Sequence, residues 1–142
     1  MSNLFKGTDF NGDISKWDVS KVTNMSSLFE ETNFNGDISK WDVSKVTDMS
    51  CMFCWCKSFN QDISSWNVSK VTDMNSMFWE CKNFNQDISN WNVSKVTNMQ
   101  AMFWGCELFN HDISNWDVSK VKYFDNIFSN CNIEEKYKPK FK

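Results

Sequence analysis

The strongest constraint on this chain is that one segment recurs five times. The segment "FNGDISKWDVSKVTNMSSLF" begins at Phe10, and close copies begin at Phe34, Phe59, Phe84 and Phe109. The first copy precedes the second by 24 residues, and every later copy follows its predecessor by 25 residues. Self-similarity at a fixed period of this length is typical of a solenoid, in which successive coils stack on one another.

A single unit has too few apolar residues to fold alone. Its apolar positions follow the pattern F-x3-I-x2-W-x-V-x2-V-x2-M-x2-[LMI]-F. The resulting inward side chains, about eight per coil, close a core only when coils stack. The chain has 142 residues, 41% of them hydrophobic, which is enough for one domain with a sizeable core. The tryptophans keep strict register in this pattern, at Trp17, Trp41, Trp66, Trp91 and Trp116.

Local patterns within the unit predict two kinds of secondary structure. The alternation of Trp and Val with polar residues in "I-S-x-W-x-V" predicts a short strand with one buried face. Further on, the apolar spacing widens to three and four, which predicts a short helix or 3-10 turn. Its cap would be a threonine in the first four units, namely Thr23, Thr47, Thr72 and Thr97.

We therefore predict an α/β repeat solenoid of about five and a half coils. Short parallel strands would lie on one face and short helical or 3-10 turns on the other. Residues 1–131 would form this single solenoid, and residues 132–142 a polar, Lys-rich cap or tail.

The repeat also resembles a known family. The unit "MFxxCxxFNxDISxWxVSKVTxM" is similar to the 25-residue repeat of BspA-like leucine-rich repeat surface proteins, which also occurs in mycoplasma-type lipoproteins and is predicted in some large DNA viruses. The similarity extends from about Leu4 to Cys131. It implies a right-handed solenoid like that of leucine-rich repeats, and a role in binding other proteins, often as an adhesin-like surface module.

The N-terminal sequence and the net charge limit the expected location of the protein and the class of its partner. The N-terminus "MSNLFKGTDF" lacks the pattern of a signal peptide, and no window approaches 18 apolar residues. From the chain as it stands we expect a cytoplasmic protein without direct membrane insertion, whereas the resemblance implies the cell surface. The net charge is −3 and no arginine is present, so we expect no nucleic-acid partner.

The stretch "CMFCWC", residues 51–56, contains a C-x-x-C spacing that raises the question of a zinc or redox site. In the repeat alignment Cys51 falls in a small-residue position, and Cys54 falls in a variable position that we expect to be exposed. We therefore interpret the spacing as an accident of unrelated positions. A zinc site needs four converging ligands, and His111, the one histidine, lies about two coils away.

A third cysteine position is held by Thr8 and Thr32 in the early units and then recurs at Cys56, Cys81, Cys106 and Cys131. Residues at the same position of neighbouring coils would lie about 4.8 Å apart, which is within the Cα range of a disulfide. By distance alone, disulfides between Cys56 and Cys81 and between Cys106 and Cys131 are therefore possible. We favour reduced thiols packed in the core, because stacked side chains point the same way and the chain shows no secretory signal.

Two charged positions also repeat. The first is the aspartate of each "N-x-D-I-S" turn, at Asp13, Asp37, Asp62, Asp87 and Asp112. A column of these carboxylates could bind calcium, but we favour the alternative that each one caps backbone N–H groups in its own turn.

The second is the lysine of each "V-S-K-V" segment, at Lys21, Lys45, Lys70, Lys95 and Lys120. These lysines form either a solvated charge ladder or a binding site for an anionic polymer, and we favour the charge ladder.

No catalytic constellation or cofactor fingerprint is present, so we expect a non-enzymatic protein-protein interaction module without a cofactor. A structural or self-assembling solenoid is the alternative, and an adhesin-like surface fragment is a second one that follows from the resemblance alone. An uncovered solenoid end also predicts end-to-end or edge-mediated self-association. The identity of the protein partner stays open.

Two surfaces are candidates for partner binding, because function should lie where repeats differ. The first consists of residues that flank the inward Trp on the predicted strand, a face that passes from charged to amide-rich: Lys16, Asp18, Lys40, Asp42, Ser65, Asn67, Asn90, Asn92, Asn115 and Asp117. The second consists of Trp55, Trp79 and Trp104, which are either interface anchors or covers for the cysteine ladder.

Overall fold

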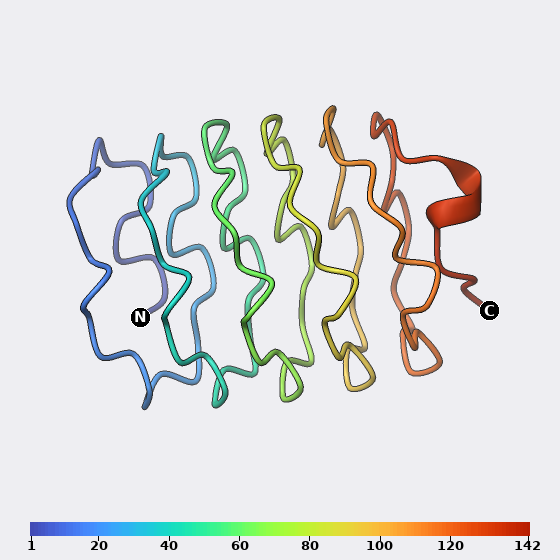
Figure 1. Cartoon of the computed structure of the whole chain (residues 1–142), viewed down its shortest axis with the longest axis horizontal. Coiled ribbons are helices and arrows are strands. Elements are labelled where there is room, and N and C mark those ends of the chain that lie inside the picture. The colour runs from blue at the N-terminus through green and yellow to red at the C-terminus, as the bar shows by residue number, and fades with distance from the viewer.

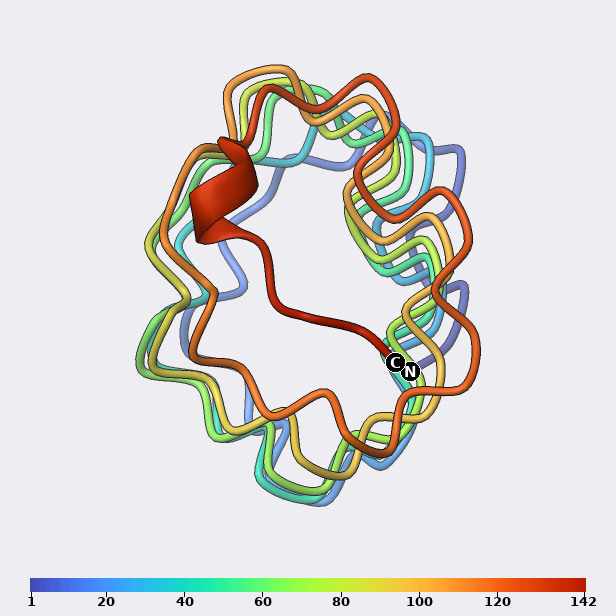
Figure 2. The same cartoon turned by 90° about the vertical axis from the view of Figure 1, so that its right-hand side faces the viewer.

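A computed structural model describes residues 1–142. The chain winds through successive coils that lie side by side along the long axis (Figure 1) and overlie one another when viewed along it (Figure 2). A half-coil, residues 1–9, precedes five coils that each hold one copy of the repeat. We number the coils by their residues: 10–33, 34–58, 59–83, 84–108 and 109–131.

The secondary structure of these coils differs from the prediction. The one regular element is the 3-10 helix η1, Glu135–Tyr137, which lies after the last coil. Parallel pairing is confined to isolated bridges that join successive coils at Asn24, Asp48, Asp73, Asn98 and Tyr123. The predicted α/β leucine-rich-repeat-like solenoid, with a parallel sheet on one face and helical turns on the other, is therefore wrong.

Tight turns replace the predicted strand. In the third coil the backbone N–H of Ser64 donates to Asp62 Oδ1 at 2.9 Å, and the N–H of Trp66 donates to the Ile63 carbonyl at 3.1 Å. A second such turn is closed by the N–H of Val71, 2.9 Å from the Val68 carbonyl. These amides are used within their own coil, so they cannot form the ladder that a strand requires.

Left-handed residues replace the predicted helix. Two positions in each coil have positive φ, which interrupts any right-handed helix. At the first position φ lies between 52° and 59°, in Asn3, Ser27, Cys51, Ser76, Ala101 and Asn126. At the second it lies between 54° and 72°, in Gly7, Glu31, Trp55, Glu80, Gly105 and Asn130. The segment is a run of tight turns, which we call the turn column (residues 25–32 and their equivalents in the other coils).

The threonines predicted to cap helices instead join coils. The N–H of Thr47 donates to the Thr23 carbonyl at 2.8 Å, and its hydroxyl donates to the same oxygen at 3.3 Å. Thr72 and Thr97 repeat both contacts, each to the threonine of the preceding coil.

Alternate amides of the turn column hold neighbouring coils together. In the second coil the N–H groups of Met49, Cys51, Phe53 and Trp55 donate to carbonyls of the third coil at 2.7–3.0 Å. The amides between them, such as that of Cys54, close turns inside the coil. The backbone of the turn column is thus satisfied half across coils and half within them.

The core runs continuously along the stack. One column of phenylalanines has ring centroids 5.6–5.8 Å apart between coils, at Phe5, Phe29, Phe53, Phe78, Phe103 and Phe128. Beside it, each indole Nε1–H donates to the isoleucine carbonyl of the preceding coil at 3.1–3.3 Å, from Trp41, Trp66, Trp91 and Trp116. Trp17, in the first of the five coils, makes no such bond and is 43% exposed.

The two ends of the stack differ. Residues 132–142 cross the end of the fifth coil (Figure 2), where the Ile113 N–H donates to the Tyr137 carbonyl at 3.0 Å and Phe141 stacks on Phe124. At the other end Leu4 and Trp17 are exposed. The structure has no helix with the length and apolar character needed to cross a membrane.

The cross-coil indole bond generates a stability prediction. Trp66→Phe removes the indole donor of the Ile38 carbonyl, which then keeps only the N–H of Trp41, so we expect a loss of about 0.5–1.5 kcal/mol in unfolding free energy. Trp17→Phe removes no such bond and should cost less than about 0.5 kcal/mol. Urea unfolding followed by circular dichroism compares the two variants, and equal losses would contradict the proposed role of the bond.

Candidate functional site

Most side chains of the first predicted surface make hydrogen bonds within the protein. One carboxylate or amide oxygen of each of five side chains accepts the backbone N–H of the serine two residues later, at 3.0–3.1 Å: Asp18, Asp42, Asn67, Asn92 and Asp117. These side chains cap tight turns, and no sheet lies behind them. Their partner-binding role stays a prediction, but their turn contacts already explain why the position is Asp or Asn.

The residue two positions before each of these caps also belongs to the first predicted surface, and its contacts differ between the early and the later coils. Ser65, Asn90 and Asn115 donate to serine carbonyls of the preceding coil at 2.9, 3.0 and 3.3 Å. Lys16 and Lys40, in the first two coils, are exposed and form no ion pair. The change from charged to amide-rich residues is therefore also a change from free side chains to side chains that bridge coils.

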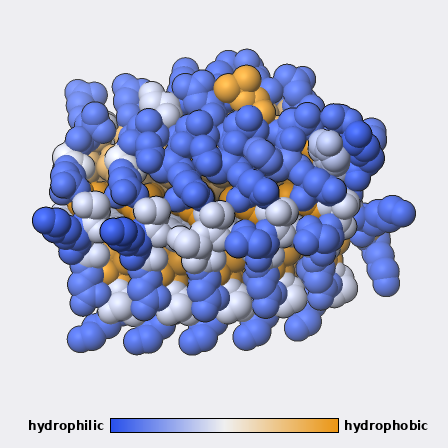
Figure 3. Space-filling view, in the orientation of Figure 1, coloured by the Kyte–Doolittle hydropathy of each residue, from blue (hydrophilic) through white to orange (hydrophobic).

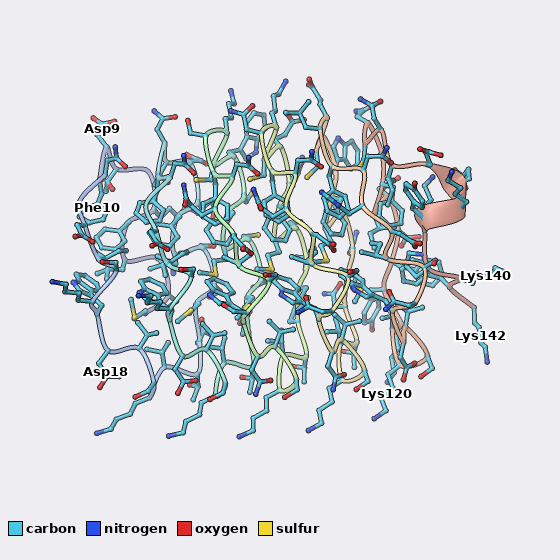
Figure 4. All side chains as sticks on the ribbon, viewed as in Figure 1. Asp9, Phe10, Asp18, Lys120, Lys140 and Lys142 are labelled. Carbon is cyan, nitrogen blue, oxygen red and sulfur yellow. The ribbon has the colours of Figure 1, made fainter.

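The repeated aspartates make hydrogen bonds within their turns, whereas the repeated lysines make no ion pairs. Each aspartate of the "N-x-D-I-S" turns accepts the N–H of a serine at 2.9–3.0 Å, at Asp13, Asp37, Asp62, Asp87 and Asp112. No group of three or more His, Cys, Asp or Glu side chains is placed to hold a metal ion. The repeated lysines are exposed without an ion pair, and Figure 4 shows Lys120 extending away from the stack.

The turn caps predict a specific acid sensitivity. The hydroxyl and the N–H of Ser44 bond the Asp42 carboxylate and hold its pKa below the ordinary 3.8. A lowered folded-state pKa means that the carboxylate stabilises the fold above pH 3.8, and that this contribution is lost as the pH falls through the folded pKa. Asp42→Asn keeps the acceptor, as Asn67 does, and removes the titration. Acid unfolding should therefore show a shallower decline for Asp42→Asn than for the wild type, and identical declines would contradict this role.

The second predicted surface lies on the outer side of the turn column. The rings of Trp79 and Trp104 are half-buried and adjacent, with centroids 5.8 Å apart and planes tilted by 39°. Trp55 is 41% exposed, and the ammonium of Lys57 lies 5.3 Å from its ring centroid. We call Trp55, Trp79 and Trp104 the turn-face aromatics. A shallow cavity of about 360 Å³ adjoins Trp55, between Glu31 and Lys57.

Charged pairs flank these aromatics. Lys82 Nζ lies 2.8 Å from Glu107 Oε1 and 3.8 Å from Glu80 Oε2. The carboxylate of Glu80 lies over Gly105, where a Cβ atom would meet Glu80 Oε1 at 2.6 Å. On the other side Lys6 pairs with Glu30 at 3.0 Å. The view in Figure 3 shows how hydrophilic side chains line the coils, with apolar atoms visible between their rows.

The repeated cysteines are part of the core. All six cysteines are free thiols, and Cys56, Cys81 and Cys106 are fully buried. Their thiols donate to backbone carbonyls, for example from Cys81 to Cys56 at 3.1 Å and from Cys106 to Phe78 at 2.9 Å. Burial raises the pKa of Cys56 to about 11 and raises the pKa of Cys81 and Cys106 well above the ordinary value.

Cys54 does not lie where the alignment suggested. We expected an exposed side chain, but Cys54 is 4% exposed and lies in the same turn as the half-buried Cys51, with its N–H 3.1 Å from the Cys51 carbonyl. At the equivalent position Trp79 and Trp104 are half-buried, so this position is at least partly covered in all three coils. Sequence reasoning missed this because the same position carries a charged residue in the first units.

Thiol accessibility should follow this burial. In the native reduced protein we expect an alkylating reagent to modify Cys51 first, while Cys56, Cys81 and Cys106 react only after unfolding. Time-resolved alkylation with peptide mapping measures the order. Modification of the three buried thiols as fast as Cys51 would contradict the packed ladder, and alkylation in denaturant provides the reference of six reactive thiols.

Comparison with known proteins places the chain in a family. A family model described as "Mycoplasma protein of unknown function, DUF285" matches residues 1–78 and again residues 56–138. No curated protein and no solved structure matched the chain. The two matches overlap and together cover residues 1–138, which include every repeat and part of the segment that follows them. The chain therefore belongs to this family, which is known as the BspA-like repeat family.

Proposed function

We propose that this chain is a non-enzymatic protein-binding module that contacts its partner through the turn-face aromatics. The observation that supports this most is the pair of adjacent, half-exposed indoles of Trp79 and Trp104. Equivalent positions in other units hold Lys6, Glu30 and Ser129, so the coil itself does not need an aromatic residue there. Clustered exposed aromatics of this kind are typical anchors of protein interfaces.

The surroundings of the pair also suit an interface. Interfaces bury an aromatic centre and keep a polar rim in contact with water. Here Trp79 and Trp104 form the centre, and the charges of Glu80, Lys82 and Glu107 form one side of the rim. The turn column presents these side chains on a backbone held by cross-coil hydrogen bonds, so little ordering is needed when a partner binds.

A structural, self-assembling role is the second candidate, and Trp17 favours it. Every later repeat tryptophan donates its indole N–H to the preceding coil, whereas Trp17, in the coil at the N-terminal end of the stack, makes no such bond and is 43% exposed. A second copy of the chain that covered this end would bury Trp17 and Leu4 together. Light scattering tests this candidate, because a mass that stays monomeric at all concentrations counts against it.

The surface-protein role implied by the repeat is a third proposal. It rests on the resemblance to BspA-like surface proteins, and it names extracellular matrix or host-surface proteins as the partner class. A binding experiment should therefore offer both cell lysate and matrix proteins as prey.

The experiment is a pull-down with mass-spectrometric identification, using the wild type and the double variant Trp79→Ser and Trp104→Ser. Serine is tolerated at this position, since Ser129 occupies it in the last coil. Trp17→Ser is the control, because it removes an exposed indole at a distant site. We expect a specific prey that is retained by the wild type and the control and reduced at least about tenfold by the double variant. Equal retention by all three would contradict the proposed site.

A further inference from the structure

Two thiols meet in a single turn of the second coil. Cys51 and Cys54 are the first and last residues of a turn that is closed by the 3.1 Å hydrogen bond from the Cys54 N–H to the Cys51 carbonyl. The Cα atoms at the ends of such a turn lie less than about 7 Å apart. A disulfide accepts Cα separations of about 4.4–6.8 Å. The turn therefore brings the two Cα atoms to a separation compatible with a disulfide.

The fold does not need thiols at these two positions. Equivalent positions in other coils hold the pairs Ser27 and Glu30, Ser76 and Trp79, Ala101 and Trp104, and Asn126 and Ser129. The core ladder of Cys56, Cys81 and Cys106, by contrast, is fully buried. Only the second coil thus combines two thiols in one turn of the outer wall.

The environment gives the two thiols different roles. Hydrogen bonding from Cys54 lowers the pKa of Cys51, and the charge of Lys6 acts in the same direction, while partial burial and the charges of Glu30 and Asp73 oppose them. Cys54 is buried, and its hydrogen bond to Cys51 and its desolvation raise its pKa. Cys51 is therefore the thiol that reacts first with a reagent, as a thiolate. Cys54 is the second thiol, which reacts only with the product formed at Cys51.

We propose that Cys51 and Cys54 form a redox-active dithiol that a low-molecular-weight disulfide oxidises to an intramolecular disulfide. In the first step the Cys51 thiolate attacks one sulfur of the reagent, whose S–S bond breaks and releases one thiolate that takes up a proton. In the second step the Cys54 sulfur attacks the Cys51 sulfur of this mixed disulfide and releases the second thiol, which retains the proton from Cys54. Two electrons pass from the cysteines to the reagent, which leaves as two thiols.

This inference does not depend on the proposed binding function. The dithiol nevertheless lies beside the turn-face aromatics, because Trp55 follows Cys54 directly and Trp79 holds the position of Cys54 in the next coil. Oxidation would join the Cys51 and Cys54 side chains in the turn that leads to Trp55. Its chemical test requires no binding partner.

Glutathione disulfide is the probe, added to the native, reduced chain at neutral pH with intact-mass analysis over time. We expect the wild type to lose the mass of two hydrogen atoms, and fragmentation of the tryptic peptide 46–57 to place the link between Cys51 and Cys54 rather than Cys56. Cys54→Ser should stop at a glutathione adduct on Cys51, and Cys51→Ser should react at least about tenfold more slowly.

Serine is already present in both positions of other coils, as Ser27 and Ser129, so both variants are matched to the fold. Three outcomes overturn the proposal: a wild type that accumulates a stable glutathione adduct, a link that involves Cys56, or an equally fast reaction of Cys51→Ser. The first two are read on the wild type alone, so the test stands even if a variant fails to fold.

Discussion

Hydrogen bonds between the turn columns of neighbouring coils hold this structure together. Each column directs every second amide at the next coil, and the second and third coils share four such bonds at 2.7–3.0 Å. A net contribution of about 0.5–1.5 kcal/mol per bond is modest, but the bonds fix the register in which everything else packs. The phenylalanine column and the indole bonds follow from that register. So do the positive φ values of non-glycine residues such as Ser76 and Glu80, a conformation that persists only where its surroundings enforce it.

The length of a coil is coupled to the residue that ends its turn column. In the first coil the Thr32 hydroxyl accepts the N–H of Phe34 at 3.3 Å, with a single residue between them. In the second coil Cys56 takes the place of Thr32, two residues follow it, and the N–H of Phe59 instead donates to the Cys56 carbonyl at 3.2 Å. Thr8 repeats the short arrangement, and Cys81 and Cys106 repeat the long one. From Phe10 to Phe109, threonine at this position thus accompanies the 24-residue step and cysteine accompanies the 25-residue steps.

Much of the core could be predicted from the sequence, whereas the backbone conformation could not. The period identified the inward Phe, Ile, Trp and Met positions, and the "N-x-D-I-S" turns were predicted as aspartate caps, as Asp62 and Ser64 show. The strand prediction failed because apolar residues alternate with polar ones equally well in two successive turns. The helix prediction failed because left-handed positions carry Ser, Cys, Trp and Glu, with glycine only at Gly7 and Gly105. Among the candidate site residues, Trp79 and Trp104 proved adjacent, and Cys54 proved buried rather than exposed.

The central claim is that coils join through the turn column and not through a sheet. Residue-specific amide hydrogen exchange in the third coil tests it most directly. The amides of Met74, Ser76, Phe78 and Glu80 donate to the fourth coil, so they should be strongly protected. Ser65 and Asn67 are exposed and lie in the segment that was predicted to be a strand, and their amides have no acceptor, so they should exchange rapidly. Protection of Ser65 and Asn67 equal to that of the turn column would reveal a parallel ladder there and contradict this account.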